Sequence, residues 1–365
     1  MKIKDIVAIL ETTAPLSLQE EYDNAGLITG QAGWDCTGVV VALDATEAVI
    51  EDAIARNANM VIAHHPIVFK GLKKINGYNY VEKALITAIK KDIAIYAIHT
   101  NLDNIIQGVN GRMADKLGLI NRQILAPKKG ILKKIQTYVP VSYLENVREA
   151  LFDAGAGSIG AYSDCSFSSM GTGSFKGGEA TKPFVGQPGK RHYEEEQKLE
   201  MIFEGWKERQ IMEALYSSHP YEELAYDIIT LDNRLQSIGA GIIAELPEAM
   251  EAAAFFDLLK SAFGLKIIRH SPFLSKKLTK IAICGGSGSF LTSSAIAAGA
   301  DIFVTADIKY HEFFDANGQL ILADIGHYES EQYTQDLICD VLQQKFPTFA
   351  IQKTVVQTNP VQYWG

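Results

Sequence analysis

From Gly38 onward the sequence alternates short β-branched runs with longer helical patterns, and this alternation sets the class of fold. Repeated units of strand, helix and strand are typical of a mostly parallel sheet covered by helices. In the first half of the chain the expected strands are residues 39–43, 60–63 and 93–98, and the expected helices are residues 47–56 and 81–91. The pattern therefore predicts an α/β protein.

The same alternation returns near the other end of the chain. The expected strands there are residues 238–244, 280–284, 301–305 and 319–323. At 365 residues the chain is longer than one hydrophobic core usually supports, and its content of 47% apolar and 21% charged residues is that of a globular protein. The two halves either share one sheet or form two packed lobes.

The middle of the chain follows a different order: strand, helix, strand, strand, helix, strand. It opens with a strand at residues 133–139 and a helix that Ser142 is expected to cap together with Glu145. This order favours a split βαβ, ferredoxin-like module, with a long mobile loop in the Gly-rich stretch 171–189. We therefore expect three segments, a first core part at 1–131, an inserted domain at 132–231 and a second core part at 232–365.

Charge and cysteine content disfavour several classes of protein. The net charge is -9 and no dense run of Lys and Arg occurs, so a nucleic-acid partner is disfavoured. The four cysteines lie far apart, contain no C-x-x-C pair and are expected to be buried free thiols. No stretch approaches the roughly 18 apolar residues of a membrane span, and we expect a cytoplasmic protein with no membrane partner.

The segment MVIAHHPIVF at 60–69 carries the strongest sign of chemistry, because an apolar strand ends there in His64 and His65. Ligands of open α/β sheets gather at the carboxyl ends of strands. Neighbouring side chains on an extended backbone point to opposite sides, which favours two ions over one shared ion. The alternative for a single histidine is a structural residue held by a hydrogen bond.

The strand at 93–98 runs into HTNLDN, which places His99 and Asp103 at the end of a neighbouring strand. Asp103 is an oxygen ligand able to bridge two cations, and His99 can bind a metal or orient a residue that does. The alternative for Asp103 is an Asx turn or a cap of the following helix.

His327 and Glu331 follow the strand at 319–323 and stand four residues apart at the start of a helix. Residues at this spacing share a helix face, so one imidazole and one carboxylate can reach a common ion. The alternative is a solvent-facing helix start. Three histidines and two carboxylates suit two divalent ions such as zinc, iron, manganese or nickel. The predicted ligands are His64, His65, Asp103, His327 and Glu331.

Other polar segments are weaker candidates. The Gly-rich GGSGSF at 285–290 can receive a phosphate or form a tight turn, and the turn is favoured because no nucleotide-binding fingerprint is present. In TADIKYHE, which also contains Asp307, Lys309 can bind an anion and His311 can move protons. A solvated helix start explains them almost as well. Asp23 and Asn24 are further candidates for the same cleft.

Several motifs together resemble the Nif-three-like proteins, also labelled GTP cyclohydrolase 1 type 2 homologues. They are EYDNAGL at 21–27, AHHP at 63–66, HTNLD at 99–103, GVNGRMADKLGL at 108–119, TADIKYHE at 305–312 and GHYESE at 326–331. The resemblance implies a dinuclear site at the five ligands named above. It also implies a PII-like or CutA-like insert, which SSHPYEELAYD at 217–227 resembles, and a toroidal homohexamer.

These observations lead to two hypotheses for function. The first is a metal-dependent hydrolase acting on a nucleotide or another phosphate-containing small molecule, since two ions leave coordination positions for water and substrate. The resemblance suggests GTP. The second is a non-catalytic metal-handling or regulatory protein whose insert senses a small molecule or a partner. DNA binding by a ring-shaped assembly is disfavoured by the acidic balance.

Overall fold

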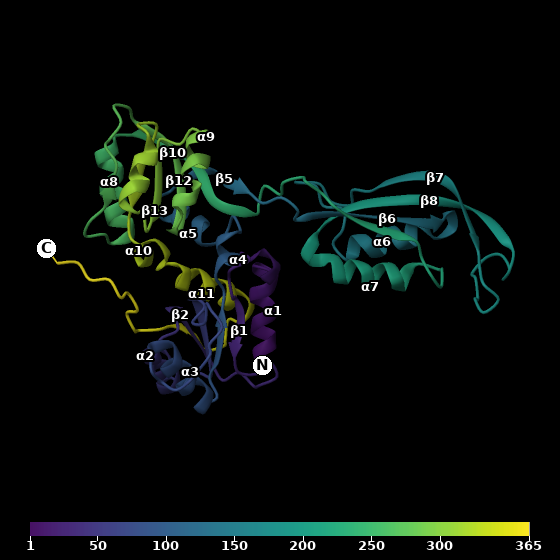
Figure 1. Ribbon diagram of the computed structural model, residues 1–365, viewed down its shortest axis with the longest axis horizontal. Coiled ribbons are helices and arrows are strands. Elements are labelled where there is room, and N and C mark those ends of the chain that lie inside the picture. Colours follow the sequence, from purple (N-terminus) through teal and green to yellow (C-terminus); the bar gives the residue numbers. More distant parts are fainter. Residues whose placement is uncertain (365) are drawn as a thin grey trace. The chain divides into compact units, whose positions relative to one another are not determined.

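The computed structural model describes residues 1–364 and divides the chain into two compact units (Figure 1). The core unit consists of Met1–Pro127 and the segment from Gln236 onward, and the insert unit consists of Lys128–Leu235. No helix among the described residues is both long enough and apolar enough to cross a membrane.

One sheet of the core unit is mostly parallel. Its strands in spatial order are β1 (Gly26–Thr29), β4 (Ala94–Ala97), β3 (Met60–His65), β2 (Val39–Asp44) and β15 (Ile351–Lys353). Only β1 runs antiparallel to its neighbour. The side chains of β2 and β3 are buried along both faces, as expected for a sheet covered by helices on each side.

The helices beside this sheet begin at capping residues. α2 (Glu47–Ala55) follows Thr46, whose hydroxyl accepts the N–H of Val49, and α3 (Tyr80–Lys90) follows Asn79, whose side chain accepts the N–H of Glu82. Both helices pack their apolar sides on the sheet. α11 (Thr334–Lys345) contacts β2 and β15 and packs against α1 (Ile3–Thr13).

The second sheet of the core unit is mixed. Its strands in spatial order are β11 (Arg269–His270), β14 (Ile321–Asp324), β13 (Ile302–Ala306), β12 (Leu278–Ser287), β10 (Gly239–Met250) and β5 (Ile120–Pro127). The pairs β12–β13 and β13–β14 are parallel, and the other pairs are antiparallel. The expectation of a mostly parallel sheet is therefore wrong for this half, because an apolar run predicts a strand but not its direction.

Helices cover both faces of the second sheet. α8 (Ala252–Phe263) and α5 (Val109–Lys116) share one apolar cluster with it, and α9 (Thr292–Ala297) belongs to another. Figure 1 shows two short helices, α4 (Thr100–Asp103) and α10 (His327–Glu331), in the region between the two sheets. Strands of both sheets therefore end near this one region of the core unit.

The insert unit has one antiparallel sheet and two helices. Its elements are β6 (Leu132–Pro140), α6 (Leu144–Asp153), β7 (Phe167–Lys176), β8 (Arg191–Glu204), α7 (Glu208–Ser218) and β9 (Tyr226–Thr230). The spatial order of the strands is β7, β8, β6, β9. The apolar sides of both helices share one buried cluster with β6 and β8.

Three local expectations require correction. Ser142 does not cap α6, because it lies in a 3-10 turn at Val141–Tyr143 and the Glu145 side chain pairs with Arg148. The stretch 171–189 is not one loop, because its first residues belong to β7 and are paired with β8. Cys165 is only half-buried, although all four cysteines are free.

Candidate metal centre

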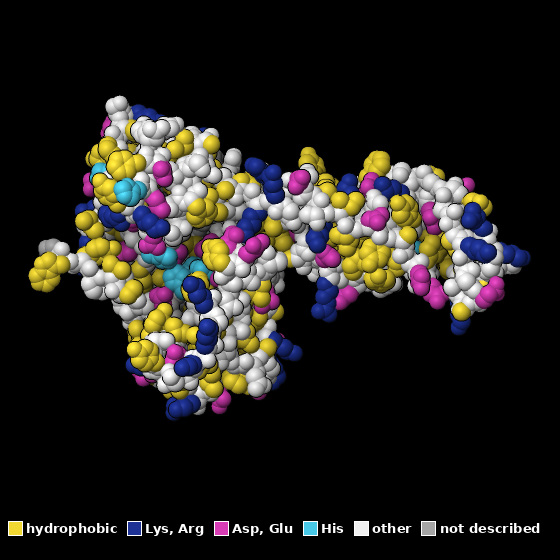
Figure 2. Space-filling view, viewed as in Figure 1, with side chains coloured by type: hydrophobic (Ala, Val, Ile, Leu, Met, Phe, Trp, Pro, Cys, Tyr) yellow, Lys and Arg dark blue, Asp and Glu magenta, His cyan; other side chains and the backbone are white. Residues whose placement is uncertain are grey.

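The five predicted ligands come from three places that the core unit brings together. His64 and His65 end β3, Asp103 ends α4 directly after β4, and His327 and Glu331 begin and end α10 after β14. Figure 2 shows histidine side chains gathered in a hollow on this face of the core unit. The hollow belongs to a cavity of about 570 Å³ whose lining includes His65, Asp103, His327 and Glu331.

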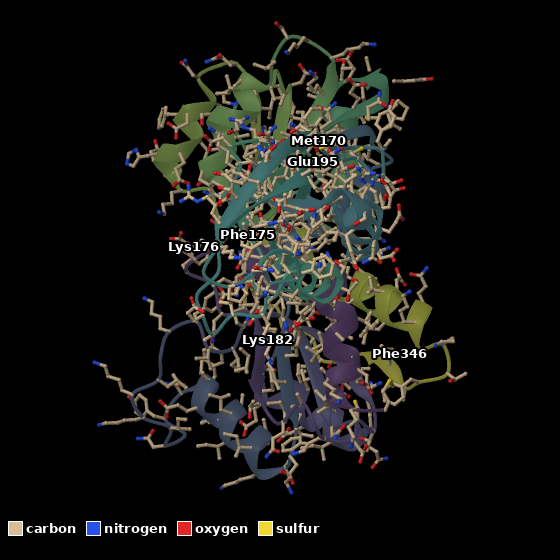
Figure 3. The ribbon with its side chains drawn as sticks, turned by 90° about the vertical axis from the view of Figure 1, so that its right-hand side faces the viewer. Met170, Phe175, Lys176, Lys182, Glu195 and Phe346 are labelled. Carbon is tan, nitrogen blue, oxygen red and sulfur yellow. The ribbon has the colours of Figure 1, made fainter. Side chains whose placement is uncertain are left out.

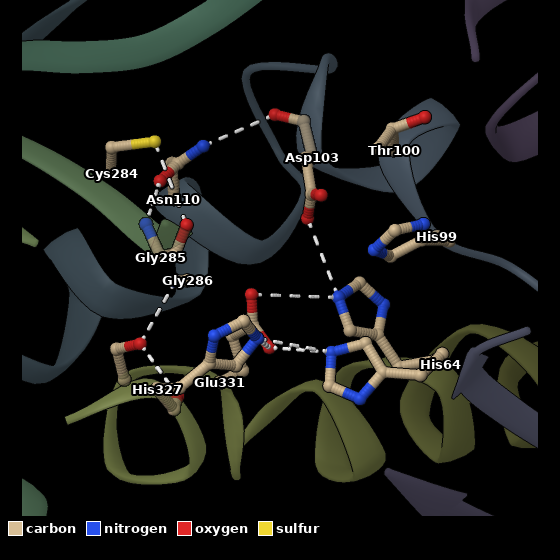
Figure 4. Close-up of polar contacts among 12 residues, drawn as sticks. His64, His99, Thr100, Asp103, Asn110, Cys284, Gly285, Gly286, His327 and Glu331 are labelled. Carbon is tan, nitrogen blue, oxygen red and sulfur yellow. Dashed lines mark hydrogen bonds and ion pairs between the residues drawn. The ribbon is translucent and has the colours of Figure 1, made fainter. Parts of the chain in front are cut away.

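Glu331 lies at the centre of this group (Figure 4). One of its oxygens, Oε2, is 2.9 Å from His65 Nε2 and 3.1 Å from His327 Nε2. Its other oxygen, Oε1, is 3.9 Å from His64 Nε2, which in turn is 3.6 Å from Asp103 Oδ1. The two oxygens of one carboxylate thus face two different sets of ligand atoms.

The side chains of His64 and His65 point in less different directions than the alternation along a β-strand predicts. The ring centroids of His64 and His65 are 5.0 Å apart, and both rings face the Glu331 carboxylate. His65 is the last residue of β3, so no further strand residue holds its side chain on the opposite face. They nevertheless approach different oxygens of Glu331.

Every imidazole at the centre is held through its Nδ1 atom. The acceptors are Ile98 O for His64 at 2.8 Å, Asp44 Oδ1 for His65 at 2.8 Å, Asp23 Oδ1 for His99 at 2.8 Å and Asp307 Oδ2 for His327 at 2.7 Å. A carbonyl or carboxylate accepts, so Nδ1 donates, and Nε2 is the atom that can offer a lone pair to a metal once it carries no proton. This is the usual support of histidines that bind metals, and it fixes both ring orientation and tautomer.

Two buried polar atoms at the centre have no hydrogen-bond partner among residues 1–364. They are His64 Nε2 and Asp103 Oδ1. His64 is fully buried, and a buried polar atom without a partner is costly unless something else satisfies it. Imidazole nitrogen and carboxylate oxygen are both good ligands of divalent transition metals, so the donor set fits a metal ion.

Geometry leaves a choice between His99 and Asp103. Two groups of three residues could hold an ion with ligand atoms within 4.8 Å of one another, namely His64, His65 and His99, and His65, His327 and Glu331. Asp103 is in neither group, although its oxygen is 3.6 Å from His64 Nε2. The buried Oδ1 atom of Asp103, which has no hydrogen-bond partner among the described residues, favours Asp103 as the ligand.

The electrostatics of the centre are those of a crowded acidic site. Burial and the charge of Glu331 raise the pKa of Asp103 to about 7. Burial would lower the pKa of His65, but hydrogen bonds to Asp44 and Glu331 raise it to about 9. Burial would likewise lower the pKa of His327, but Asp307 and Glu331 raise it to about 11. A divalent cation would therefore compete with protons for these ligands.

Gly286 makes room for Glu331. It has φ +63°, and a Cβ there would lie 2.3 Å from Glu331 Oε1, whereas a Cβ on the neighbouring Gly285 would first meet Val109 Cγ1 at 2.9 Å. The N–H of Gly285 donates to Asn110 Oδ1 and that of Gly286 donates to Ser330 Oγ (Figure 4). These amides are already used, so this part of GGSGSF packs against the carboxylate and is no phosphate loop.

The structure places the weaker candidate residues in different surroundings. Asp23 and Asp307 each accept from a histidine of the centre, whereas Asn24 donates to Val68 O. Lys309 and His311 are exposed and do not line the cavity, so their expected roles find no support. The sequence reasoning missed Asp44. Its signal was its position at the end of the strand beside His65, since β2 and β3 pair Asp44 with His65.

Comparison with known proteins covers the whole chain. Residues 1–360 match the family described as Duf34/NIF3 (NGG1p interacting factor 3). A GTP cyclohydrolase 1 type 2 homolog of Halalkalibacterium halodurans is 40% identical over 88% of this chain and 87% of its own length, and one of Bacillus subtilis is 38% identical over 89% and 88%.

Solved structures agree with this result. A Bacillus cereus protein related to NIF3 matches 100% of this chain and 99% of its own, with a TM-score of 0.85 and 37% identity. Staphylococcus aureus protein SA1388 matches the same shares with a TM-score of 0.78 and 30% identity. The chain therefore belongs to the Duf34/NIF3 (NGG1p interacting factor 3) family.

Proposed function

We propose that the centre binds two divalent metal ions through His64, His65, Asp103, His327 and Glu331, and that the protein is a metal-dependent hydrolase. The proposal rests on two buried atoms without a hydrogen-bond partner, His64 Nε2 and Asp103 Oδ1. They lie beside the carboxylate of Glu331, whose two oxygens face different ligand atoms. Zinc, iron, manganese and nickel suit this mixture of nitrogen and oxygen ligands.

Residues of the chain orient the imidazole rings of the proposed ligands and bury the innermost of these ligands. Asp44 and Asp307 hold the rings of His65 and His327, and the backbone of Ile98 holds His64. When bound, a pair of such ions supplies an activated water near neutral pH and neutralises charge on a leaving oxygen. His64 and Glu331, which are 0% and 3% exposed, lie away from bulk water because the surrounding fold buries them.

The cavity suits a substrate of nucleotide size. Its volume of about 570 Å³ lies within the usual range of small-molecule sites. Its walls combine the rings of Tyr22, Phe69 and Phe290 with the polar side chains of Thr46 and Asn104. The name of the relatives, GTP cyclohydrolase 1 type 2 homolog, supports a nucleotide or another phosphate-containing small molecule.

The test combines metal content with turnover. Elemental analysis of the purified chain should give two ions per chain, and Asp103→Ala and Glu331→Ala should each reduce this number without unfolding. Asp315→Ala, at an exposed carboxylate, is the control. Two ions per chain in either ligand variant would contradict the assignment.

Turnover is measured with metal-loaded protein against GTP and a panel of phosphoesters. Activity that falls in parallel with metal content supports the hydrolase. If the loaded protein turns over no substrate and passes its metal to an acceptor, the second hypothesis holds, that of a non-catalytic metal-handling or regulatory protein.

We further propose a ferredoxin-like insert of the PII or CutA kind and a homohexameric assembly. The order of elements in the insert unit and its strand order β7, β8, β6, β9 support the first part. The second part rests on the resemblance to the Nif-three-like proteins, which implies a toroidal homohexamer. Light scattering coupled to size exclusion should give six times the chain mass of 40.0 kDa, and a monomeric mass would contradict the assembly.

A further inference from the structure

The insert unit contains a cavity of its own. It has a volume of about 790 Å³, within the range of small-molecule sites, and only residues of the insert unit line it. Its walls are β7, the loop after β7, the segment after α7, and side chains of β6 and β8. Figure 3 labels Met170, Phe175 and Lys176 on β7 and Lys182 in the following loop.

The cavity contains a buried carboxylate. Glu196 on β8 is 7% exposed, and the hydroxyl of Tyr221 donates to its Oε1 at 2.7 Å. Its Oε2 projects over Gly173 of β7, where a Cβ would lie 2.1 Å away. Glycine at 173 is therefore needed for the carboxylate to lie where it does.

No Lys, Arg or His among the described residues forms an ion pair with Glu196. Lys176 and Lys198 also line the cavity, but neither forms an ion pair with Glu196, and Lys198 is 3.1 Å from Glu200. Buried carboxylates in proteins usually have a charged partner, because a buried charge without a counter-charge is costly. Glu196 is therefore placed to receive a cation that enters the cavity.

Aromatic rings lie around this carboxylate. The centroid of Tyr221 is 6.2 Å from that of Phe175 and 6.3 Å from that of Phe184, and all three side chains line the cavity. The faces of aromatic rings attract cations and apolar groups alike. Glu222 and Glu223 add further acidic lining.

From these contacts we propose that the insert unit binds a small organic cation. Its ammonium group pairs with the Glu196 carboxylate, and its hydrocarbon part lies against Phe175, Phe184 and Tyr221. A carboxylate or phosphate ligand is excluded from the same position, because Glu196 would repel it. This site is distinct in residues and chemistry from the metal centre.

The first experiment uses the full chain and three probes of one shape: benzylamine, benzyl alcohol and benzoate. Calorimetric titration should show benzylamine binding about tenfold or more tightly than benzyl alcohol, with no binding of benzoate. Benzoate or benzyl alcohol binding as tightly as benzylamine would overturn the proposal, and so would failure of benzylamine to bind at millimolar concentration.

Variants locate the site. Glu196→Gln keeps the shape of the side chain and should bring benzylamine affinity down to that of benzyl alcohol, whereas Glu195→Gln, at the exposed neighbouring position labelled in Figure 3, should not change it. Equal benzylamine affinity in Glu196→Gln and the unchanged chain would refute the role of Glu196.

A further variant avoids any change of charge. Gly173→Ala should displace the carboxylate and weaken benzylamine binding, because the new Cβ would lie 2.1 Å from Glu196 Oε2. Thermal unfolding checks that the insert unit of this variant remains folded. Equal benzylamine affinity in folded Gly173→Ala and in the unchanged chain would also refute the site.

Discussion

His65 Nδ1 donates to Asp44 Oδ1 at 2.8 Å, and the same two residues are partners in the parallel ladder between β2 and β3. The support of the metal centre is thus part of the sheet itself. The other oxygen of Asp44 accepts the hydroxyl of Thr358, so the carboxylate is held in place as well.

Asp44→Asn tests this relationship. The amide cannot serve as a charged acceptor for Nδ1, so the ring of His65 loses its fixed tautomer and orientation, and metal affinity should fall by about 10- to 100-fold. A chelator competition assay measures the affinity. Asp35→Asn, at an exposed carboxylate paired only with Lys2, is the control and should match the unchanged chain. Unaltered affinity in Asp44→Asn would show that this support is dispensable.

Gly286→Ala should abolish metal binding, because the new Cβ would lie 2.3 Å from Glu331 Oε1. The positive φ of +63° adds roughly 1–2 kcal/mol of strain. Gly299→Ala separates the two effects, since Gly299 has φ +73° and nothing within 4 Å of an added Cβ. Both variants should lose stability in urea, and only Gly286→Ala should lose metal. Full metal content in Gly286→Ala would mean that Glu331 can move without loss of the site.

Asp301 lies far from the centre, and its replacement by asparagine should reduce the stability of the fold by an amount that depends on pH. Burial would raise the pKa of Asp301, but its pair with Lys276 and the N–H groups of Lys280 and Thr279 outweigh burial and lower it. A lowered pKa in the folded state stabilises the fold above the ordinary pKa of about 4, and this stabilisation is lost as the pH falls through the folded value.

Urea unfolding of Asp301→Asn at pH 7 should therefore show a loss of about 1.5–3 kcal/mol, with a smaller loss at pH 3. Asp257→Asn, on the exposed side of α8, serves for comparison and should be neutral at both values. A loss of equal size at both pH values would rule out the ionised carboxylate as its source.

Replacing residues 128–235 by a short turn should leave the metal content unchanged. All five proposed ligands belong to the core unit, and Pro127 and Gly239 are register partners of β5 and β10, so a few residues can join the strands. Circular dichroism and elemental analysis are the measurements. A folded but metal-free product would show that the insert unit contributes to the centre.

The sequence predicted the region of the centre because its signals are local. An apolar strand that ends in His64, or that is followed within a few residues by Asp103 or His327, can be recognised without knowledge of how distant segments pair. The direction of β10 could not be predicted in this way, since strand direction is set by connections and not by the residues of the strand.

Other features depend on contacts between distant segments. The need for glycine at 286 arises only when Glu331 of α10 approaches the end of β12. The strand character of residues 171–176 likewise arises from pairing with β8, since glycine and serine by themselves predict a loop.

The proposed ligand atoms come from either side of the insert unit, with His64, His65 and Asp103 before it and His327 and Glu331 after it. During synthesis the early histidines leave the ribosome long before the Glu331 carboxylate that they face exists. All five proposed ligands could therefore capture metal only after Glu331 has been synthesised. A chain terminated before Glu331 would lack the complete centre, even if β2, β3 and β4 had already folded.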